Sequence, residues 1–232
     1  MNDLVSVIMP TWNRRYCIED AINSVYCQSY HNWELIIIDD GSQDDTKKIT
    51  ETLTGNIIYS RTEHIGVAHA RNIGLELSRG KYISFLDSDN TYYNDFLLKM
   101  VEYLKKQSDF TGGVHCKTRV TNYDGHNGLK YLNTAWSVNE FHLHGDIMDI
   151  NSTLSKSEAV KYYRFNENMT RLVDYEFLLR VCTKWDYAYL DDLLVDYNRK
   201  KDSITLTEPQ KGNNWSHVWK AICEYERQRF TN

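Results

Sequence analysis

Two acidic clusters stand where apolar segments of the chain end, and their residue types are those that bind a cation. The pair Asp39-Asp40 follows the apolar run 35–38, and Asp87-Ser88-Asp89 follows the run 82–86. Carboxylates that converge repel each other unless a cation or a hydrogen-bonding ligand accompanies them. Hard oxygen ligands of this kind suit a divalent metal that carries the diphosphate of a nucleotide. The clusters therefore indicate an enzyme.

The elements that must position these clusters follow from the apolar pattern. Short apolar runs bounded by turn formers are typical of buried strands in a parallel sheet, and carboxylates just beyond them lie at its carboxyl edge, where open α/β folds bind ligands. Strand-like runs at 5–9, 35–38, 57–59 and 82–86 alternate with helical patterns at 18–25, 44–53, 66–77 and 93–105. This alternation predicts an α/β fold with a doubly wound, Rossmann-like, mostly parallel sheet flanked by helices. In the third helix we expect the inner face to be Ala70, Ile73, Gly74 and Leu77.

The pattern is weaker past residue 106. Residues 107–150 are rich in Gly, Asn, His and aromatic residues, with a strand-like part at 114–121. We expect irregular structure that lines a site, because long loops in compact domains are usually functional. A buried segment at 147–154, a short helix near 156–162 and a helix at 174–184 follow. The segment 215–230 predicts an amphipathic helix that packs on its own domain, with a peripheral membrane or partner helix as the alternative.

Composition narrows the class of protein. A chain of 232 residues forms one large or two small domains, and a net charge of −5 provides no global basic field for a nucleic-acid partner. The five cysteines form no Cys-x-x-Cys pair, which is typical of reduced thiols in a cytosolic protein. No apolar stretch approaches the ~18 residues of a spanning helix. We expect a cytoplasmic protein that makes at most peripheral contact with the inner face of a membrane.

The ordered motifs of the chain resemble those of the family-two glycosyltransferases, which are inverting enzymes with the GT-A fold. In the first 105 residues these motifs are Val5–Arg14, Ile38–Ser42, Gly66–Gly74 and Gly80–Asp89. The second half matches through Arg164–Glu167, Val173-Asp174 and Tyr197–Thr205, and is the half that varies in the family. The resemblance implies one GT-A domain over 1–232, with a nucleotide-sugar-binding half at 1–106, an acceptor-binding and catalytic-base half at 107–205, and an amphipathic helix within 206–232.

The resemblance also implies the activity. Such enzymes move a sugar from a nucleoside-diphosphate sugar, most often a UDP-sugar, to a hydroxyl of a glycan or lipid-linked glycan, and act in surface polysaccharide or glycan synthesis. Asp39 would accept a hydrogen bond from the base. The residues that the resemblance assigns to the nucleotide sugar are Pro10, Thr11, Asn13, Asp39, Asp40, Arg71, Asp87 and Ser88.

Two of these residues have structural alternatives. Asp40 could instead cap the turn at Gly41-Ser42. Arg71 could form a surface salt bridge, although its place near a helix amino terminus suits a diphosphate or the carboxylate cluster.

By the same resemblance, Asp89 binds Mn²⁺ or Mg²⁺ directly, and Asp87 faces the ribose or the metal shell. Oxygen ligands fit either ion, which would neutralise charge on the departing nucleoside diphosphate. Many relatives add a His ligand near the end of the domain, but the matching position here is Lys200. A protonated lysine cannot be a ligand, so Lys200 is expected either to contact the diphosphate or to face solvent.

The general base is expected to be Asp174. Inversion in one displacement needs a carboxylate that takes the proton of the acceptor hydroxyl. In the family this residue is the Asp of a Glu-Asp pair that opens a helix, and here the pair is Val173-Asp174. The helix amino terminus is expected to keep Asp174 ionised. Glu176 is the competitor, but its spacing to Arg180 fits an ordinary i, i+4 surface pair.

Other functions fit less of the pattern. A GT-A-like nucleotidyltransferase would show a Gly-rich loop with Arg and Lys after the first strand, and residues 10–15 are not such a loop. A non-catalytic nucleotide- or carbohydrate-binding module would not need Asp39, Asp87, Asp89 and Asp174 together. A dinucleotide-binding oxidoreductase would show Gly-x-Gly-x-x-Gly after the first strand, which is absent. The sequence identifies neither the sugar nor the acceptor, which we expect the stretch 107–165 to select.

Overall fold

The computed structural model describes residues 3–121, 130–132 and 148–198, and the single positions 218, 220 and 223. The strands are β1 (Val5–Thr11), β2 (Trp33–Asp39), β3 (Ile57–Arg61), β4 (Tyr82–Phe85), β5 (Thr91–Tyr92), β6 (Thr111–Thr121), β7 (Lys130–Leu132), β8 (Thr153–Lys156) and β9 (Asp186–Asn198). The helices are α1 (Ile18–Tyr26), α2 (Thr46–Thr50), α3 (Val67–Leu77), α4 (Phe96–Leu104), the 3₁₀ turn η1 (Ile150–Ser152), α6 (Ser157–Val160) and α7 (Val173–Val181).

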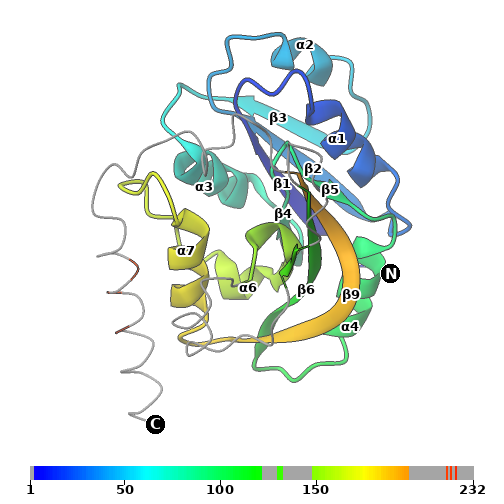
Figure 1. The fold of residues 1–232 in the computed structure, drawn as a ribbon, viewed down its shortest axis with the longest axis vertical. Helices are drawn as coiled ribbons and strands as arrows, with labels where there is room; N and C mark the ends of the chain where they lie inside the picture. The colour runs from blue at the N-terminus through cyan, green and yellow to red at the C-terminus, as the bar shows by residue number, and fades with distance from the viewer. Residues whose placement is uncertain are drawn as a thin grey trace.

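The described strands form one curled sheet in the order β3-β2-β1-β4-β8-β6-β9-β5, with β7 paired to β6 (Figure 1). Strands β1 to β4 pair in parallel throughout. Beyond β4 the sheet is mixed, because β8 runs antiparallel to both β4 and β6, whereas β6 and β9 are parallel. The predicted α/β fold with its doubly wound sheet is confirmed, and the carboxyl ends of β1, β2 and β4 share one edge.

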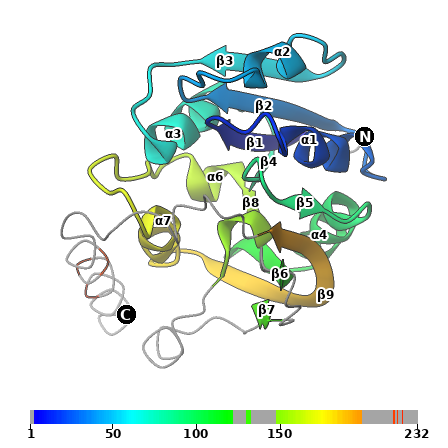
Figure 2. The ribbon, with the colours of Figure 1, turned by 45° about the horizontal axis from the view of Figure 1, so that its top comes forward.

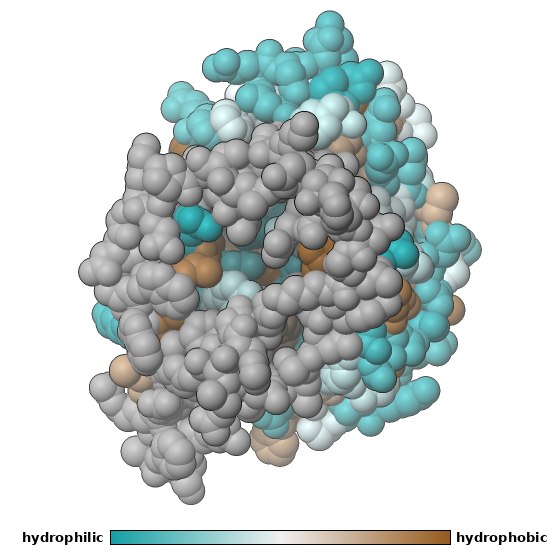
Figure 3. Space-filling view, viewed as in Figure 1, coloured by the Kyte–Doolittle hydropathy of each residue, from teal (hydrophilic) through white to brown (hydrophobic). Residues whose placement is uncertain are grey.

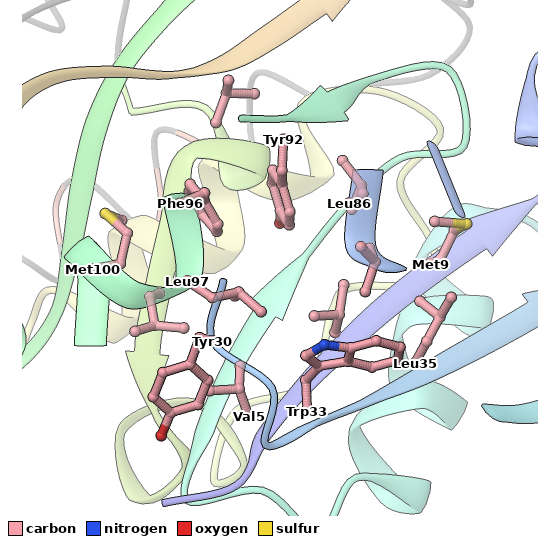
Figure 4. Packing of buried hydrophobic residues seen from close by; sticks show 14 of the residues in the cluster. Val5, Met9, Tyr30, Trp33, Leu35, Leu86, Tyr92, Phe96, Leu97 and Met100 are labelled. Carbon is pink, nitrogen blue, oxygen red and sulfur yellow. The ribbon is translucent and has the colours of Figure 1, made fainter. Parts of the chain in front are cut away.

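Helices cover both faces of the sheet: α1 and α4 lie on one, and α3, α6 and α7 on the other (Figure 2). On the first face, α1 buries the stripe that its 3.6-residue period predicts, namely Ile18, Ala21, Ile22 and Val25, each at most 1% exposed. Its outer side is polar, and the surface over α1 and α2 is largely hydrophilic (Figure 3). Figure 4 shows side chains from β1, β2, β5 and α4 pointing toward one another, with the rings of Tyr92 and Phe96 stacked 3.8 Å apart.

On the second face, α3 packs closely on β1. A Cβ atom on Gly74 would lie 2.3 Å from Cγ2 of Ile8, so glycine is required there by contact. The expectation that Leu77 faces inward is wrong, since it is 37% exposed. Instead α3 buries Arg71 and Asn72, because both side chains find hydrogen-bond partners inside the protein.

Replacing this helical glycine tests the packing. Gly74→Ala is expected to lower the free energy of unfolding by about 1–3 kcal/mol, because the added methyl overpacks the contact with Ile8. Alanine's higher helix propensity, worth up to about 1 kcal/mol, opposes this effect. Urea denaturation measures the difference, with Glu102→Ala on the exposed side of α4 as the control. A Gly74→Ala variant more stable than the wild type would show that α3 does not pack as described.

The strand-like part predicted at 114–121 is confirmed as β6, which begins earlier, at Thr111, and is paired on both sides, with β8 and β9. The pairing of β6 with β9 shifts register near Gly113 and near Lys117. The glycines of β6 are packing residues rather than loop formers: a Cβ atom on Gly113 would lie 2.4 Å from the ring of Tyr187 on β9. Strand β9, which the sequence pattern did not predict, carries the chain back to the site. Residues 122–129 and 133–147 lie outside the described part of the chain.

The predictions for the end of the chain are tested only in part. Lys200 and most of 215–230 lie outside the described residues. Three positions of that segment are helical, and the side chain of Val218 is fully buried in the apolar cluster with α3 and α7. This burial favours a helix that packs on its own domain. Within the described residues, no helix has the length and apolar character needed to cross a bilayer.

Candidate active site

Both acidic clusters lie at the shared carboxyl edge of the sheet, as predicted. Thr11 at the end of β1 pairs with Asp39 at the end of β2, and Asp39 in turn pairs with Arg61 on β3. The main-chain N–H of Asp40 donates to the carbonyl of Thr11 at 2.9 Å. Strand β4 pairs with the other side of β1 and ends two residues before Asp87. The two clusters therefore flank the end of β1.

Asp39 is fully buried and has a partner on each carboxylate oxygen. Its Oδ1 accepts from the main-chain N–H of Ser42 at 2.7 Å, and its Oδ2 accepts from the hydroxyl of Tyr59 at 2.8 Å. Burial, together with the charge and hydrogen bond of Asp39, raises the pKa of Tyr59 to about 12, so this phenol remains a donor. Asp39 thus shapes the turn after β2, with Arg61 4.0 Å away as its nearest cation among the described ion pairs.

Asp40 does not cap the turn that follows it. Its carboxylate accepts from the main-chain N–H groups of Ile65 at 2.9 Å and Gly66 at 3.0 Å, and binds Nδ1 of His64 at 2.8 Å. The imidazole of His64 stacks on the indole of Trp12, with centroids 4.2 Å apart. Asp40 therefore fixes the loop that precedes α3, next to the turn after β1.

Asn13 ties the turn after β1 to the turn after β2. Its main-chain N–H donates to Oγ of Ser42 at 2.9 Å, and its side-chain oxygen accepts from the N–H of Gln43 at 2.8 Å. Asn13 has φ 52°, a left-handed conformation that asparagine tolerates better than most residues. The neighbouring Pro10 and Thr11 are buried at the floor of the edge.

Arg71 and Asp87 form the central ion pair of the site. Nη2 of Arg71 donates to Oδ1 of Asp87 at 2.7 Å, and Arg71 is only 5% exposed. Burial lowers the pKa of Arg71, but the carboxylates of Asp87 and Asp174 more than offset this, so the net shift of its pKa is upward. The alternative of a surface salt bridge is wrong, because this pair joins α3 to the end of β4 inside the protein.

A second partner of Asp87 was missed by the sequence interpretation. The amide oxygen of Asn151 in η1 accepts from the main-chain N–H of Asp87 at 2.6 Å, and its Nδ2 donates to Oδ2 of Asp87 at 3.2 Å. The same Nδ2 donates to Asp149 at 2.8 Å. Burial raises the pKa of Asp149 to about 7, against the hydrogen bonds from Asn151, and Asp174 and Asp87 raise it further. Asp149 is thus a further carboxyl group at the site.

Asp174 lies in the first turn of α7, and the helix terminus does not dominate its ionisation. Burial raises the pKa of Asp174, Arg71 opposes this, and Asp87 adds to it, for a net upward shift. The upward shift opposes the effect expected of the helix amino terminus, and the ionisation of Asp174 at neutral pH stays a prediction. The same acids surround the end of β9, where burial raises the pKa of Tyr197, and Asp149, Asp87, Asp89 and Asp174 raise it further.

Glu176, the competing base, is committed to another partner. Its two oxygens accept from Nε and Nη2 of Arg180 at 2.6 and 2.8 Å, as the i, i+4 spacing predicted. The Glu176 side chain is only 7% exposed and that of Arg180 is 27% exposed, so the pair is partly buried rather than fully at the surface. Asp174 therefore remains the candidate base on α7, and its pKa is affected by Asp87 of the site.

Asp89 lies near Arg14 and Asn198. Its Oδ2 lies 3.9 Å from Nε of Arg14, and its main-chain oxygen accepts from Nδ2 of Asn198 at 3.2 Å. Ser88 between the two acids is buried. The oxygen donors of Asp87 and Asp89 fit Mn²⁺ or Mg²⁺. Among the described residues no group of three or more His, Cys, Asp or Glu side chains could hold a metal ion, so the protein ligands there do not complete a shell.

Motifs of the two halves of the chain also contact each other. Asn72 of α3 donates from Nδ2 to the carbonyl of Phe165 at 3.0 Å and accepts from the N–H of Phe165 at 2.8 Å. His69, one turn earlier, binds Glu167 at 3.0 Å. Segment Arg164–Glu167 therefore fixes the helix that carries Arg71.

Buried polar atoms without a partner gather at the same edge. In native structures such atoms are rare, and each calls for an explanation such as a ligand. Of the five such atoms among the described residues, three flank the acidic clusters: Oγ1 of Thr11, Nε of Arg71 and Nδ2 of Asn90. These atoms are candidates to bind a polar ligand beyond the ends of β1 and β4.

Open α/β sheets bind their ligands at the carboxyl ends of the strands, and the polar residues of this domain gather at that edge. The family model of Glycosyl transferase family 2 matches residues 6–169. The chain belongs to this family, so the family predicted from its motifs is confirmed.

Relatives of known name cover part of the chain. TuaG of Bacillus subtilis, named for teichuronic acid biosynthesis, is 43% identical over 119 residues, which are 47% of this chain and 46% of TuaG. WfgD of Escherichia coli, a UDP-Glc:alpha-D-GlcNAc-diphosphoundecaprenol beta-1,3-glucosyltransferase, is 38% identical over 107 residues, which are 45% of this chain and 42% of WfgD. The matches thus span less than half of each of these relatives.

Solved structures match the whole fold. The structure of S. aureus TarS 1–349 in complex with UDP-GlcNAc has a TM-score of 0.79 at 17% identity, over 97% of this chain and 66% of that one. Mannosyltransferase PcManGT from Pyrobaculum calidifontis, in complex with GDP-Man and Mn²⁺, has a TM-score of 0.70 at 19% identity, over 100% and 65%. At such identities the likeness establishes the fold alone, which is the predicted GT-A architecture.

Proposed function

We propose that this protein transfers a sugar, with inversion, from a nucleoside-diphosphate sugar to a hydroxyl group of a glycan or lipid-linked glycan in the synthesis of a surface polysaccharide. The observation that carries the proposal is the joint placement of Asp39, Arg71, Asp87 and Asp89 with orphaned donors at one sheet edge. Family membership supports the reaction class, and the names of TuaG and WfgD support the polymer and the acceptor.

The donor is expected to bind across the carboxyl edge, with UDP as the first candidate because TarS and WfgD are named with UDP-sugars. Thr11 and Asp39 would contact the base and ribose, above Pro10. Asn13 and Asp40 would hold the two loops around the nucleotide, as their hydrogen bonds do in the structure. Nε of Arg71 has no hydrogen-bond partner, so it is available to the diphosphate, beside Ser88. Lys200 is proposed as a further diphosphate contact, although it lies outside the described residues.

Asp89 and Asp87 would hold Mn²⁺ or Mg²⁺ at the end of β4. The bound ion supplies Lewis-acid stabilisation of the negative charge that develops on the departing diphosphate. The described residues provide too few ligands for a preformed cage, so the donor's phosphate oxygens would complete the shell. PcManGT, a protein of the same fold, was solved with Mn²⁺ and its donor together, which supports this choice of ion.

Asp174 would act as the general base from the acceptor side, in the half 107–205. The acceptor oxygen attacks the anomeric carbon, the bond to the diphosphate breaks, and the acceptor's proton passes to the Asp174 carboxylate. A raised pKa makes this carboxylate a stronger base than an exposed aspartate. The nearby positive charge of Arg71 favours the ionised form of Asp174, because it opposes the effect of burial on the pKa.

A ligand panel tests the proposed function. Thermal unfolding is measured with UDP, GDP and ADP, and with UDP-linked sugars, each in the presence of Mn²⁺. A ligand at 100 times its Kd stabilises the native state by about 2.7 kcal/mol, so specific donors stand out. We expect UDP and at least one UDP-sugar to raise Tm most. If nucleoside triphosphates with sugar phosphates were turned over instead, the protein would be a nucleotidyltransferase; if no nucleotide raised Tm, the donor site would be rejected.

Asp39→Asn tests the donor-base assignment. An alanine would leave the N–H of Ser42 and the hydroxyl of Tyr59 unpaired, whereas asparagine can accept from one and donate to the other. We expect UDP affinity to fall by about tenfold, because a hydrogen bond to a charged group contributes about 1.5–3 kcal/mol, while Tm changes little. Calorimetric titration with UDP measures this. An Asp44→Asn variant in the same loop is the control, and unchanged UDP affinity in Asp39→Asn would refute the assignment.

A further inference from the structure

Asn151 has no role in the activity proposed above, yet its amide makes the most specific contacts at the site. Asn151 is fully buried in η1, and its side chain bonds to two different acids. Its Oδ1 accepts from the main-chain N–H of Asp87 at 2.6 Å, and its Nδ2 donates to the carboxylates of Asp87 at 3.2 Å and Asp149 at 2.8 Å. Both the oxygen and the nitrogen of the amide therefore have hydrogen-bond partners.

Chemistry fixes the orientation of this amide. A main-chain N–H can only donate, so the atom that faces the nitrogen of Asp87 must be the amide oxygen of Asn151. The nitrogen then faces the two carboxylates, and the reverse orientation would oppose oxygen to oxygen at both. Asp149 reinforces this arrangement, because its Oδ1 also accepts from the main-chain N–H of Asn151 at 2.8 Å. Asp149 therefore holds Asn151, and Asn151 holds Asp87.

The Asp87 carboxylate is therefore held by hydrogen bonds to both of its oxygens. Arg71 donates to its Oδ1 at 2.7 Å and Asn151 donates to its Oδ2. The terminal torsion of an aspartate is broad, so without such contacts the carboxyl plane would vary. Each carboxylate oxygen has about two acceptor positions, so both retain capacity toward a cation or a ribose hydroxyl.

The fold explains how this contact arises. Asp87 and Asn151 are separated by 64 residues in sequence. Strand β8 pairs antiparallel with β4, with Leu154 opposite Ser84, so η1 just before β8 lies beside the end of β4. The acceptor-side half of the chain thereby contacts a residue of the donor-side half.

We propose that Asn151 is a positioning residue that sets the geometry of Asp87 for the divalent ion and the nucleoside diphosphate, and that Asp149 orients the Asn151 amide. This inference rests on the proposed function, because it assigns Asp87 to the ion and the donor. Groups that orient metal ligands typically change metal affinity or activity by about 10–100-fold when removed. The structure assigns that role to an amide that the motifs of the chain do not include.

A double-mutant cycle tests the proposal with Mn²⁺ binding in the presence of saturating UDP, measured by calorimetry. Asn151→Ala is expected to weaken Mn²⁺ binding by about 10–100-fold. In an Asp87→Ala background the same substitution is expected to have no further effect, because residues that act through one another are not additive. A loss of equal size in both backgrounds would show that Asn151 only stabilises the fold, and would overturn the proposal.

Asp149 provides a second test if Asn151→Ala fails to fold. Asp149→Ala removes the acceptor for Asn151, whereas Asp149→Asn keeps an acceptor oxygen at that position, and both remove the same charge. We expect Mn²⁺ affinity to be about tenfold lower in Asp149→Ala than in Asp149→Asn. Equal affinities would overturn the orienting role.

The remaining controls separate this inference from the proposed function. Asn56→Ala, an exposed position at the opposite edge of the sheet, is expected to leave Mn²⁺ affinity unchanged. A wild-type protein that binds no Mn²⁺ with UDP would reject the proposed function. A wild type that binds Mn²⁺ with UDP, combined with additive behaviour of Asn151→Ala, rejects the positioning role alone.

Discussion

Asp174→Asn is expected to lower turnover by about 10²–10⁴-fold with little change in donor affinity, because asparagine keeps the shape of the side chain but cannot accept the proton. The residue lies in the first turn of α7, within the electrostatic influence of Arg71 and Asp87. Initial rates with a UDP-sugar give kcat, and calorimetry with UDP gives the donor affinity. A variant with normal turnover would show that another group takes the proton.

Two carboxyl variants serve as controls for this experiment. Glu176→Gln removes the partly buried ion pair with Arg180 and is expected to reduce stability, with turnover changed only a few-fold. Asp149→Asn removes a second carboxyl group of the site, one whose pKa the charge of Asp174 raises. If one of these variants were inactive and Asp174→Asn remained active, that residue would be the base in place of Asp174.

The pH dependence of the wild type follows from the same assignment. A general base must be ionised to act, and the pKa of Asp174 is raised. Activity is therefore lost as pH falls through a value above the ordinary aspartate pKa of about 3.9. A profile of kcat/KM against pH should show this acidic limb, and Asp174→Asn should lack it. An acidic limb at the same pH in the variant would assign the titration to another group.

The fold of residues 1–106 could largely be predicted, because the sequence patterns that define its strands and helices are local. Each strand there is a short apolar run that ends in turn formers, and each helix has a buried stripe of the right period. Parallel pairing then brings Asp39 and Asp87 to one edge without knowledge of the details. The pattern could not predict the hydrogen-bond partners of each carboxylate. Asp39, rather than Asp40, accepts from the turn, and Asp40 accepts from a loop 25 residues away.

The other half was harder to predict because its determinants are long-range. The glycines of β6 indicated a loop, but Gly113 is required by the ring of Tyr187, which is remote in sequence. In the first half, long-range contacts caused one error of the same kind: Leu77 fits the helical stripe of α3 but is 37% exposed, whereas Arg71 and Asn72 are buried by hydrogen bonds to distant residues. Asp149 carries no motif, and only the antiparallel pairing of β8 with β4 places it at the site. An isolated Asp in an aperiodic stretch has no sequence signal of this kind.

The second large effect is expected at Asp89, the proposed direct metal ligand. With Asp87 and Asp89 proposed as its protein ligands, the ion is expected to bind weakly to the free protein and more tightly once a nucleotide supplies phosphate oxygens. Asp89→Ala leaves Asp87, phosphate and water to hold the ion. We expect this variant to lose the gain in UDP affinity that Mn²⁺ gives the wild type. Turnover should fall by about 10³-fold, since the ion contributes several kcal/mol of charge stabilisation and each 1.36 kcal/mol is tenfold in rate.

Calorimetric titrations of UDP with and without Mn²⁺ measure this gain in the wild type and in Asp89→Ala. The control is Asp20→Ala, which removes an exposed carboxylate of α1 and one negative charge without touching the site. Both variants remove one negative charge. A difference between them in the gain of UDP affinity therefore reports loss of a metal ligand rather than a change in the net charge of the protein. Equally tight Mn²⁺ binding to the wild type with and without UDP would reveal a preformed protein cage. In that case residues beyond Asp87 and Asp89 would complete the shell, and the donor's phosphates would not be needed to hold the ion.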